Sequence, residues 1–329
     1  MNILITGGAG FIGSHLVDYL ITKKEIKKII VLDNIEDGSL KNLKDALKNS
    51  KVKFIKRDIR NFKSIKDCFI NIDQVVHLAA LSDIVPSIEN PLEYLNTNIM
   101  GTINILESMR CHKVKKIIYS ASSSCYGIPS NVPTREIDKI NTKYPYAYSK
   151  YIGEQTIKHW SDVYKIKYIS LRLFNVYGTR SRTHGAYGAA LGVFLKQKLS
   201  NTPFTVVGNG KQKRDFVYVE DVVKAFYLSI KTKKTNKIFN IGFGKPESVN
   251  SLLNYIGGKK IFIPKRPGEP EVTHANINEI KRNLKWYPSI SLKKGIEKVL
   301  KNINYWKNAP LWTPKKIEKS TKNWFKYLK

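Results

Sequence analysis

The sequence predicts an α/β fold in which a doubly wound parallel sheet is followed by a smaller α/β unit. Three observations lead to this prediction. The chain has 329 residues that are 42% hydrophobic and 11% aromatic, enough to bury a sizeable core. Through the first half, short apolar runs alternate with amphipathic segments, as strands and helices do in βαβ units. After about residue 174 the alternation loosens, and loops rich in glycine and asparagine interrupt it.

Six apolar runs in the first half have the length of buried strands. They cover residues 2–6, 28–32, 52–55, 74–78, 116–120 and 167–173. Helical patterns lie between them, near 12–24, 39–48, 62–70, 92–112 and 146–164. We therefore expect residues 1–174, with return segments near 215–245, to form the domain that contains the sheet.

Residues 175–329 are expected to form mainly the smaller unit, which we interpret as substrate-binding, with a helical C-terminal tail. Helices are predicted near 189–199, 219–232, 247–256 and 293–304. In the tail, Thr313 followed by Pro314 is a favourable helix start. The tail also holds several aromatic residues, which we expect to fasten the helix to the body, although exposed aromatics can also bind a partner. These aromatics are Tyr305, Trp306, Trp312, Trp324, Phe325 and Tyr327.

The composition favours a cytoplasmic protein that binds neither nucleic acid nor membrane. The net charge is +31, but the basic residues are 47 Lys and only 10 Arg, whereas nucleic-acid interfaces depend on arginine. We interpret the charge as a lysine-rich background. No stretch of about 18 apolar residues and no secretory signal pattern is present. The three cysteines follow no disulfide or metal-ligand spacing, so we expect no metal site.

Gly7, Gly10 and Gly13 follow the first predicted strand and open the first predicted helix. In this context the glycines allow a tight turn, and the helix N-terminus can bind a pyrophosphate. Asp33 ends the second strand, 20 residues after Gly13, where an acidic side chain binds the ribose hydroxyls of NAD and repels the 2′-phosphate of NADP. The first domain is therefore predicted to be a Rossmann domain that binds NAD.

A second constellation follows the fifth predicted strand. Ser122 lies in a serine-rich strand end, and Tyr146 and Lys150 are four residues apart, hence on one helix face. Alone, the Tyr-Lys pair could be a chance surface pair. Together with the dinucleotide-binding start, the three residues point to proton transfer coupled to oxidation of a hydroxyl.

These residues resemble the extended short-chain dehydrogenase/reductase family, in its NAD-dependent nucleotide-sugar epimerase/dehydratase branch, which includes UDP-glucose and UDP-N-acetylglucosamine 4-epimerases. The resemblance covers essentially the whole chain. Its motifs are Gly7 to Gly13, 77–80, 98–102, Ser122 with 126–127, Tyr146 with Lys150, 171–178, 214–221 and 266–268.

The resemblance implies a role for each site residue. Tyr146 would be the general base, Lys150 would favour its phenolate, and Ser122 would hold the sugar hydroxyl. The residues expected to contact NAD are Gly7, Gly10, Phe11, Ile12, Gly13, Asp33, Asn34, Asp58, Ile59, Leu78, Ala79, Ala80 and Asn98, with Tyr146 and Lys150. The residues expected to contact a nucleotide-diphosphate sugar are Ser123, Ser124, Asn175, Arg214, Arg266 and Thr273, and residues 180–190 are expected to line its sugar end.

The residues after Ser122 help to choose among the reactions of the branch. The 4,6-dehydratases resemble one another in an Asp-Glu pair there, and the decarboxylases usually keep a Glu, whereas this chain has Ser123 and Ser124. Asp33 weakens the case for an NADPH-dependent reductase. A 4-epimerase is the leading hypothesis, with a dehydrogenase that releases the 4-keto sugar as the alternative. A catalytically silent NAD-binding or RNA-binding member is a further alternative. The resemblance also implies a homodimer that pairs the helices near 92–112 and 146–164.

Overall fold

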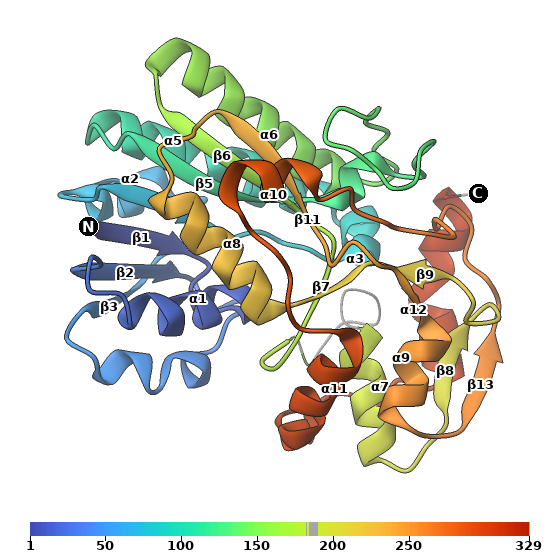
Figure 1. Cartoon of the computed structure of the whole chain (residues 1–329). Helices are drawn as coiled ribbons and strands as arrows, with labels where there is room; N and C mark the ends of the chain where they lie inside the picture. Colours follow the sequence, from blue (N-terminus) through green and yellow to red (C-terminus); the bar gives the residue numbers. More distant parts are fainter. Residues whose placement is uncertain (182, 184–189, 329) are drawn as a thin grey trace.

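The described part of the chain folds around a seven-stranded sheet with the strand order β11-β6-β5-β4-β1-β2-β3 (Figure 1). The computed structural model describes residues 1–181, 183 and 190–328. Every neighbouring pair in the sheet is parallel. The strands are β1 Asn2–Thr6, β2 Lys28–Asp33, β3 Val52–Lys56, β4 Gln74–His77, β5 Lys116–Ser122, β6 Lys167–Leu173 and β11 Lys237–Ile241. The predicted α/β fold with a doubly wound parallel sheet is confirmed.

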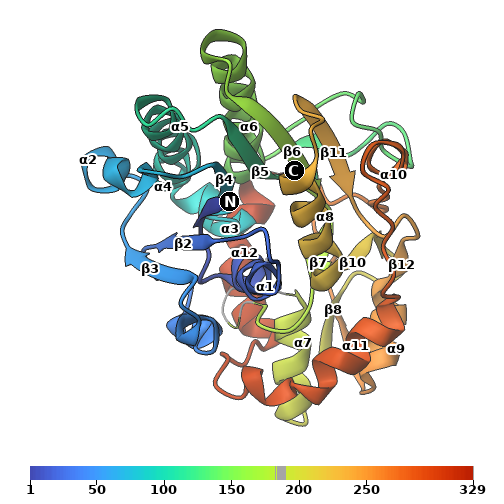
Figure 2. The ribbon, with the colours of Figure 1, turned by 60° about the vertical axis from the view of Figure 1, so that its left-hand side comes forward.

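Helices cover both faces of the sheet: α1 (Phe11–Ile21) and α8 (Val219–Lys231) on one side, and α5 (Gly101–Cys111) and α6 (Pro145–Tyr164) on the other (Figure 2). Side chains of a strand point alternately to the two faces. Accordingly, Ile3 and Ile5 join the hydrophobic cluster that includes α1 and α8, whereas Leu4 joins the one that includes α5 and α6. Because both faces are buried, the inner strands such as β1 are largely apolar, whereas the edge strand β3 combines half-buried and exposed residues.

Several expected helices are shorter or differ in type. The helix expected near 92–112 consists of α4 (Pro91–Leu95), a π-helical turn over Asn96–Met100 and α5. The segment near 39–48 forms two 3₁₀ helices instead, Leu40–Leu43 and Ala46–Lys48. Here tertiary contacts override the local pattern, because the buried Asn42 amide donates to the carbonyl of Ala9 at 3.0 Å. The segment near 62–70 is also short, with α2 (Phe62–Ile65) and a 3₁₀ turn, and α3 (Ile84–Glu89) follows β4.

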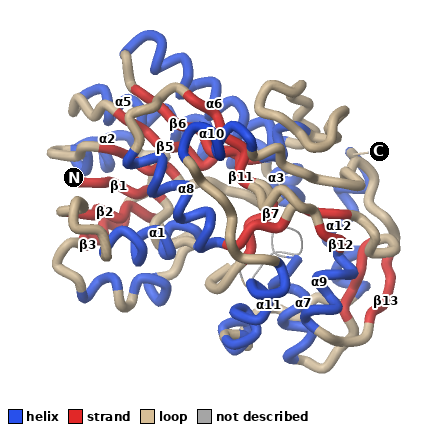
Figure 3. Tube along the Cα trace, in the orientation of Figure 1, coloured by secondary structure: helices blue, strands red, loops and turns tan. Residues whose placement is uncertain are grey.

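The rest of the described chain builds three two-stranded sheets and further helices, most of which lie beside the carboxyl ends of the main strands (Figure 3). The sheets pair β7 (Asn175–Tyr177) with β10 (Phe216–Tyr218), β9 (Lys213–Arg214) with β12 (Glu247–Ser248), and β8 (Phe204–Val207) with β13 (Lys260–Ile263). The helices are α7 Ala190–Leu199, α9 Val249–Ile256, α10 Asn278–Leu284 and α11 Leu292–Lys301.

The tail forms the helix α12 (Pro314–Tyr327), and Thr313 caps it as predicted by accepting a hydrogen bond from the backbone N–H of Lys316. Trp306 and Trp324 are buried, so aromatic side chains do fasten the tail to the body. Among the described residues, no helix has the length and apolar character needed to cross a membrane.

Candidate active site

A cavity of about 620 Å³ opens at the carboxyl ends of the main strands. The order of the sheet reverses between β1 and β4, which lie side by side, and such switch points are where ligands bind in open α/β sheets. The cavity runs from the loop after β1 to the small sheets and α12. It therefore joins the residues that the sequence assigned to cofactor and to substrate.

The loop after β1 fits a dinucleotide pyrophosphate. Gly7 has a φ of +69°, and a Cβ there would lie 2.7 Å from the backbone N of Ala79; one on Gly13 would lie 2.3 Å from the carbonyl oxygen of Gly7. Only glycine fits at either position. No side chain caps the N-terminus of α1, so its N–H groups can face an anion. Gly10, Phe11 and Ile12 also line the cavity.

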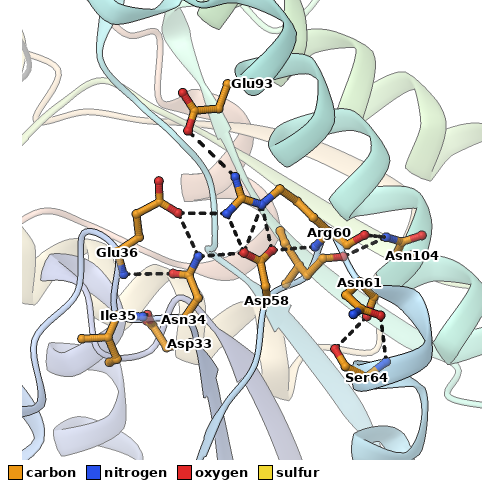
Figure 4. A network of polar contacts seen from close by, with 11 residues as sticks. Asp33, Asn34, Ile35, Glu36, Asp58, Arg60, Asn61, Ser64, Glu93 and Asn104 are labelled. Atoms are coloured by element: carbon orange, nitrogen blue, oxygen red, sulfur yellow. Dashed lines mark hydrogen bonds and ion pairs between the residues drawn. The ribbon is translucent and has the colours of Figure 1, made fainter.

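Acidic residues gather at the ends of β2 and β3 (Figure 4). The buried Asp33 carboxylate accepts the N–H groups of Ala9 at 3.0 Å and Ile35 at 2.8 Å. A carboxylate offers about four acceptor positions, so Asp33 keeps capacity for ribose hydroxyls. Burial raises the pKa of Asp33, and these two hydrogen bonds oppose the shift.

Asp58 is the centre of a neighbouring network that fixes the loop after β3 (Figure 4). Arg60 binds it at 2.6 Å and also pairs with Glu36 at 3.1 Å. The Asn34 amide donates to Asp58 at 3.1 Å. Burial works to raise the pKa of Asp58, but the hydrogen bonds from Arg60 and Asn34 outweigh it, and the net shift is downward. Asn34, Asp58 and Ile59 all line the cavity.

The loop after β4 supplies Leu78, Ala79 and Ala80 to the cavity wall. Asn98, which was predicted to contact the cofactor, lies behind this wall in the π-helical turn. Its amide donates to the carbonyl of Leu81 and accepts the N–H of Leu81, both at 2.9 Å, and it also donates to the hydroxyl of Ser149 at 2.8 Å. Asn98 therefore ties the cavity loop to α6.

Ser122, Tyr146 and Lys150 meet in the cavity wall. Ser122 ends β5, and Tyr146 and Lys150 lie on the first turns of α6, which starts at Pro145. The Ser122 hydroxyl lies near the Tyr146 phenol and favours its ionised form. The ammonium of Lys150 lies 4.2 Å from the centre of the Tyr119 ring, a favourable cation–π position.

Burial shifts the two titratable groups in opposite senses. It raises the pKa of Tyr146; the neighbouring Ser122 hydroxyl opposes this shift, and the charge of Asp83 adds to it. Burial lowers the pKa of Lys150 to about 7, and the charge of Glu154 opposes it. Each shift follows the rule that a low-dielectric surrounding favours the neutral form. Because burial disfavours the phenolate of Tyr146, a positive charge nearby is needed to favour it.

Close packing fixes α6 against β5 and β6. A Cβ on Gly153 would lie 2.6 Å from the hydroxyl of Tyr119, so glycine permits the approach. One turn past Lys150, the buried Glu154 pairs with Arg172 at 2.6 Å and accepts the hydroxyl of Ser170 at 2.6 Å. Removing one partner of such a buried pair costs roughly 3–5 kcal/mol. These contacts between α6 and the neighbouring strands fix the position of α6. They thereby also fix the positions of Tyr146 and Lys150.

At the other end of the cavity, Arg214 and Arg266 converge on one carboxylate, that of Glu269. Their distances to it are 3.5 and 2.9 Å, and Arg214 also donates to the carbonyl of Pro270 at 2.8 Å. Burial lowers the pKa of Arg214, and the charge of Glu269 opposes it. Two guanidiniums sharing one carboxylate leave a net positive charge facing the cavity, which suits a diphosphate.

Thr273 and Asn175, predicted to contact substrate, touch each other: the Thr273 hydroxyl donates to the Asn175 side-chain oxygen at 3.0 Å. Ser123 and Ser124 line the cavity beside Ser122. Of residues 180–190, Ser181 and Ala190 line the cavity, whereas residues 182 and 184–189 lie outside the described residues.

The cavity wall also contains residues that the sequence analysis did not single out for the site: Glu36, Tyr144, Glu269, Ile317 and Trp324. Glu269 directly follows the Arg266-Pro267-Gly268 motif, which was a usable signal. Trp324 had no such signal, because it lies 58 residues after Arg266 in a segment whose aromatics predicted packing or a partner-binding surface.

Comparison with known proteins agrees with this geometry. The sequence model of the NAD dependent epimerase/dehydratase family matches residues 3–242. The chain belongs to this family. The match begins with β1 and the glycine loop and includes Ser122, Tyr146 and Lys150. The predicted resemblance is thereby confirmed, and NAD is the cofactor of this enzyme.

Three relatives extend the comparison. A Methanocaldococcus jannaschii protein, proposed to be a UDP-glucose 4-epimerase, is 40% identical and aligns with 93% of this chain and 98% of its own. The structure of a Methanobrevibacter ruminantium UDP-N-acetylglucosamine 4-epimerase with UDP-N-acetylmuramic acid is 29% identical, with a TM-score of 0.85 and coverages of 92% and 98%. A Bacillus cereus UDP-glucuronic acid 4-epimerase with UDP-glucuronic acid and NAD is 31% identical, with a TM-score of 0.85 and coverages of 93% and 99%. Within its family, this enzyme is therefore similar to nucleotide-sugar 4-epimerases.

Proposed function

We propose that this enzyme inverts C4 of a UDP-linked hexose through a transient 4-keto sugar. The observation that carries the proposal is the meeting of Ser122, Tyr146 and Lys150 in one cavity with the glycine loop. The two residues after Ser122, which also line the cavity, are hydroxyl-bearing serines. A serine cannot act as the acid that water elimination requires at neutral pH, so this wall favours epimerisation over dehydration.

In the proposed reaction, Tyr146 accepts the proton of the C4 hydroxyl and later returns it. NAD, when bound, supplies the acceptor and then the donor of the C4 hydride. Ser122, which lines the cavity beside Tyr146, holds the reacting oxygen within reach of the phenol. Lys150 contributes positive charge that favours the phenolate, against the burial that disfavours it. Gly7, Gly10 and Gly13 hold the pyrophosphate, and Asp33 holds the adenosine ribose.

The nucleotide diphosphate is proposed to bind between Arg214 and Arg266, with Asn175 nearby. Both guanidiniums line the cavity, and planar forked donors match phosphate oxygens better than lysine does. The UDP moiety is favoured because the compared epimerases act on UDP-sugars. The small sheets that carry Arg214 and Asn175 would then form the substrate-binding unit.

The small side chain of Thr273 favours a substrate pocket with room for an N-acetylated hexose. It lies seven residues after Arg266, at the position where the family resemblance implies contact with the sugar, and its side chain is small. Thr273 lines the cavity and contacts Asn175. We propose that both plain and 2-acetamido hexoses are accepted.

The function can be tested with the purified enzyme and a panel of UDP-, GDP-, dTDP- and CDP-sugars, analysed by mass spectrometry with chromatographic separation of epimers. An epimerase yields the C4 epimer with no accumulation of NADH. A 4-dehydrogenase would instead release the 4-keto sugar with one NADH per product. Absence of any product from the UDP-sugars would reject the proposal.

We also propose a homodimer formed by α4, α5 and α6. Large apolar side chains are exposed on α4, on the π-helical turn that joins α4 to α5, and on α6: Leu92, Met100, Tyr148, Val163 and Tyr164. Pairing with a second copy would bury them, as in a four-helix bundle. Light scattering should give twice the chain mass of 37.7 kDa, and Val163→Glu should lower it towards the monomer. A wild-type monomer at micromolar concentration would contradict the proposal.

We propose the cytoplasm as the compartment of this enzyme, as expected from the sequence. Cys68, Cys111 and Cys125 are all free, which is compatible with a reducing environment.

A further inference from the structure

The C-terminal helix α12 forms part of the cavity wall. Ile317 and Trp324, seven residues apart, both line the cavity and, with Thr321 between them, form the buried face of α12. The family match ends at residue 242, so it does not account for this helix. A tail that only stabilised the fold would not need to border the substrate.

Trp324 begins a row of aromatic rings that ends at the proposed catalytic base. Its ring centre lies 6.3 Å from that of Tyr144. The Tyr144 ring in turn stacks on Tyr146, with centres 6.4 Å apart and planes within 7°. Tyr144 lines the cavity together with Ser124 of the serine turn. The row therefore runs along the sugar end of the cavity.

Trp324 also holds the loop that carries Arg266. Its indole N–H donates to the carbonyl of Pro267 at 2.7 Å, and the Arg266 guanidinium lies 5.8 Å from its ring centre. Gly268 follows with a φ of +72°, and a Cβ there would lie 3.3 Å from the carbonyl oxygen of Leu328. The loop and the end of α12 are packed too closely to move independently.

We infer that α12 is a built-in wall of the sugar pocket and that Tyr144 and Trp324 are specificity-determining residues. The inference rests on the proposed function. Tyr144 presents aromatic surface between the phosphate-binding arginines and Tyr146, where the C–H faces of a hexose can pack against it. The buried Trp324 lies behind Tyr144 and sets the position of its ring. Trp324 additionally acts as a positioning residue for Arg266. The tail thus selects the sugar and orients the diphosphate.

The test compares Trp324→Ala with Tyr327→Ala, a matched aromatic truncation on the exposed side of the same helix. Assays use UDP-glucose and UDP-N-acetylglucosamine, with the Kd for NAD and the Tm measured in parallel. For Trp324→Ala we expect KM to rise about three- to tenfold, the ratio of kcat/KM for the two sugars to change at least about threefold, and the Kd for NAD to stay unchanged. Tyr327→Ala should match wild type in all four quantities.

Two further variants separate the roles. Trp324→Phe keeps a ring but loses the hydrogen bond to Pro267, so the sugar ratio should be retained while KM rises. Tyr144→Leu removes the other half of the pair and should change the sugar ratio as Trp324→Ala does. If Trp324→Ala fails to fold, Tyr144→Leu decides the question.

The inference is overturned if folded Trp324→Ala and Tyr144→Leu keep the wild-type sugar ratio, or if they weaken NAD binding as much as sugar binding, since α12 would then only support the fold. Failure of the proposed function is seen separately, in the wild type. An enzyme that converts neither UDP-sugar would reject both.

Discussion

The two ends of the cavity are built in different ways. At the cofactor end, the wall comes from short segments at the ends of consecutive strands β1 to β4, and backbone atoms form much of it. At the sugar end, the wall combines side chains from α6, β7, β9, the loop around Arg266 and α12, which lie far apart in the sequence.

This difference predicts different tolerance to substitution. A Cβ on Gly13 would meet backbone atoms at 2.3 and 2.6 Å, and a backbone clash cannot relax without moving the strand. The sugar end is lined by side chains such as Thr273 and Trp324, whose replacement alters shape while the sheet stays in place. Cofactor binding should therefore be hard to change, and sugar preference easy.

The largest expected effect is at the point where the two ends meet. Tyr146→Phe should lower kcat about a hundred- to ten-thousandfold, because the general base is lost, while NAD binding and the fold persist. Steady-state kinetics and NAD titration measure this. Tyr148→Phe, an exposed tyrosine on the same helix, serves as the control. Near-normal turnover by Tyr146→Phe would remove Tyr146 from the mechanism.

A second prediction tests the rigidity of the cofactor end. Asp33→Ser combined with Glu36→Gln removes two carboxylates from the ribose region, and the affinity for NADP relative to NAD should rise roughly ten- to a hundredfold. Arg60 then loses its pairing with Glu36 and, still held by Asp58, adds positive charge near a 2′-phosphate. Glu36→Gln alone should raise the affinity for NADP relative to NAD by a smaller factor. Fluorescence titrations with both cofactors measure the ratio, and an unchanged preference in the double variant would count against the role of Asp33.

The sugar end should respond to a single side chain. Thr273→Tyr fills the pocket and should reduce kcat/KM for UDP-N-acetylglucosamine roughly tenfold more than for UDP-glucose. Thr273→Ser keeps the hydroxyl that bonds Asn175 and should behave like wild type. Equal losses on both sugars would mean that Thr273 does not limit substrate size.

The smallest effect concerns pH. The negative charge of Asp83 raises the pKa of Tyr146, since it disfavours the phenolate. Asp83→Asn removes that charge, so the pKa should fall and the rising limb of the kcat–pH profile should move to lower pH. Asp67→Asn, at an exposed side chain, is the control. A midpoint that stays in place or moves upward would contradict this assignment.

Much of the cofactor end could be predicted because its determinants are local. The runs 2–6 and 167–173 coincide with β1 and β6, and Gly7, Gly13 and Asp33 follow their strands at fixed spacing. The predicted site residues other than Asn98 all line one cavity. Asn98 differs because its side chain satisfies backbone groups of Leu81, a partner that no sequence spacing reveals.

The strand β11 shows why other elements were missed. Lys237–Ile241 is a short run within the irregular half of the chain, and it becomes the seventh strand by pairing with β6. A polar residue of the strand, Asn240, is buried and accepts a hydrogen bond from the hydroxyl of Tyr126 at 2.7 Å. Such a strand is stabilised by distant partners, so its own pattern is weak.

The sequence by itself determined the α/β fold, the NAD-binding loop and the Ser122, Tyr146 and Lys150 constellation, because strand periodicity, glycine geometry and helix spacing are properties of neighbouring residues. Only the tertiary structure decided that Arg214 and Arg266 share Glu269, that Thr273 meets Asn175, and that Trp324 reaches the cavity. The hydrogen bonds that join these segments connect residues 55 to 98 positions apart in the sequence: Arg214 with Glu269, Trp324 with Pro267, and Thr273 with Asn175. Their formation depends on how complete helices and sheets pack, which local sequence does not encode.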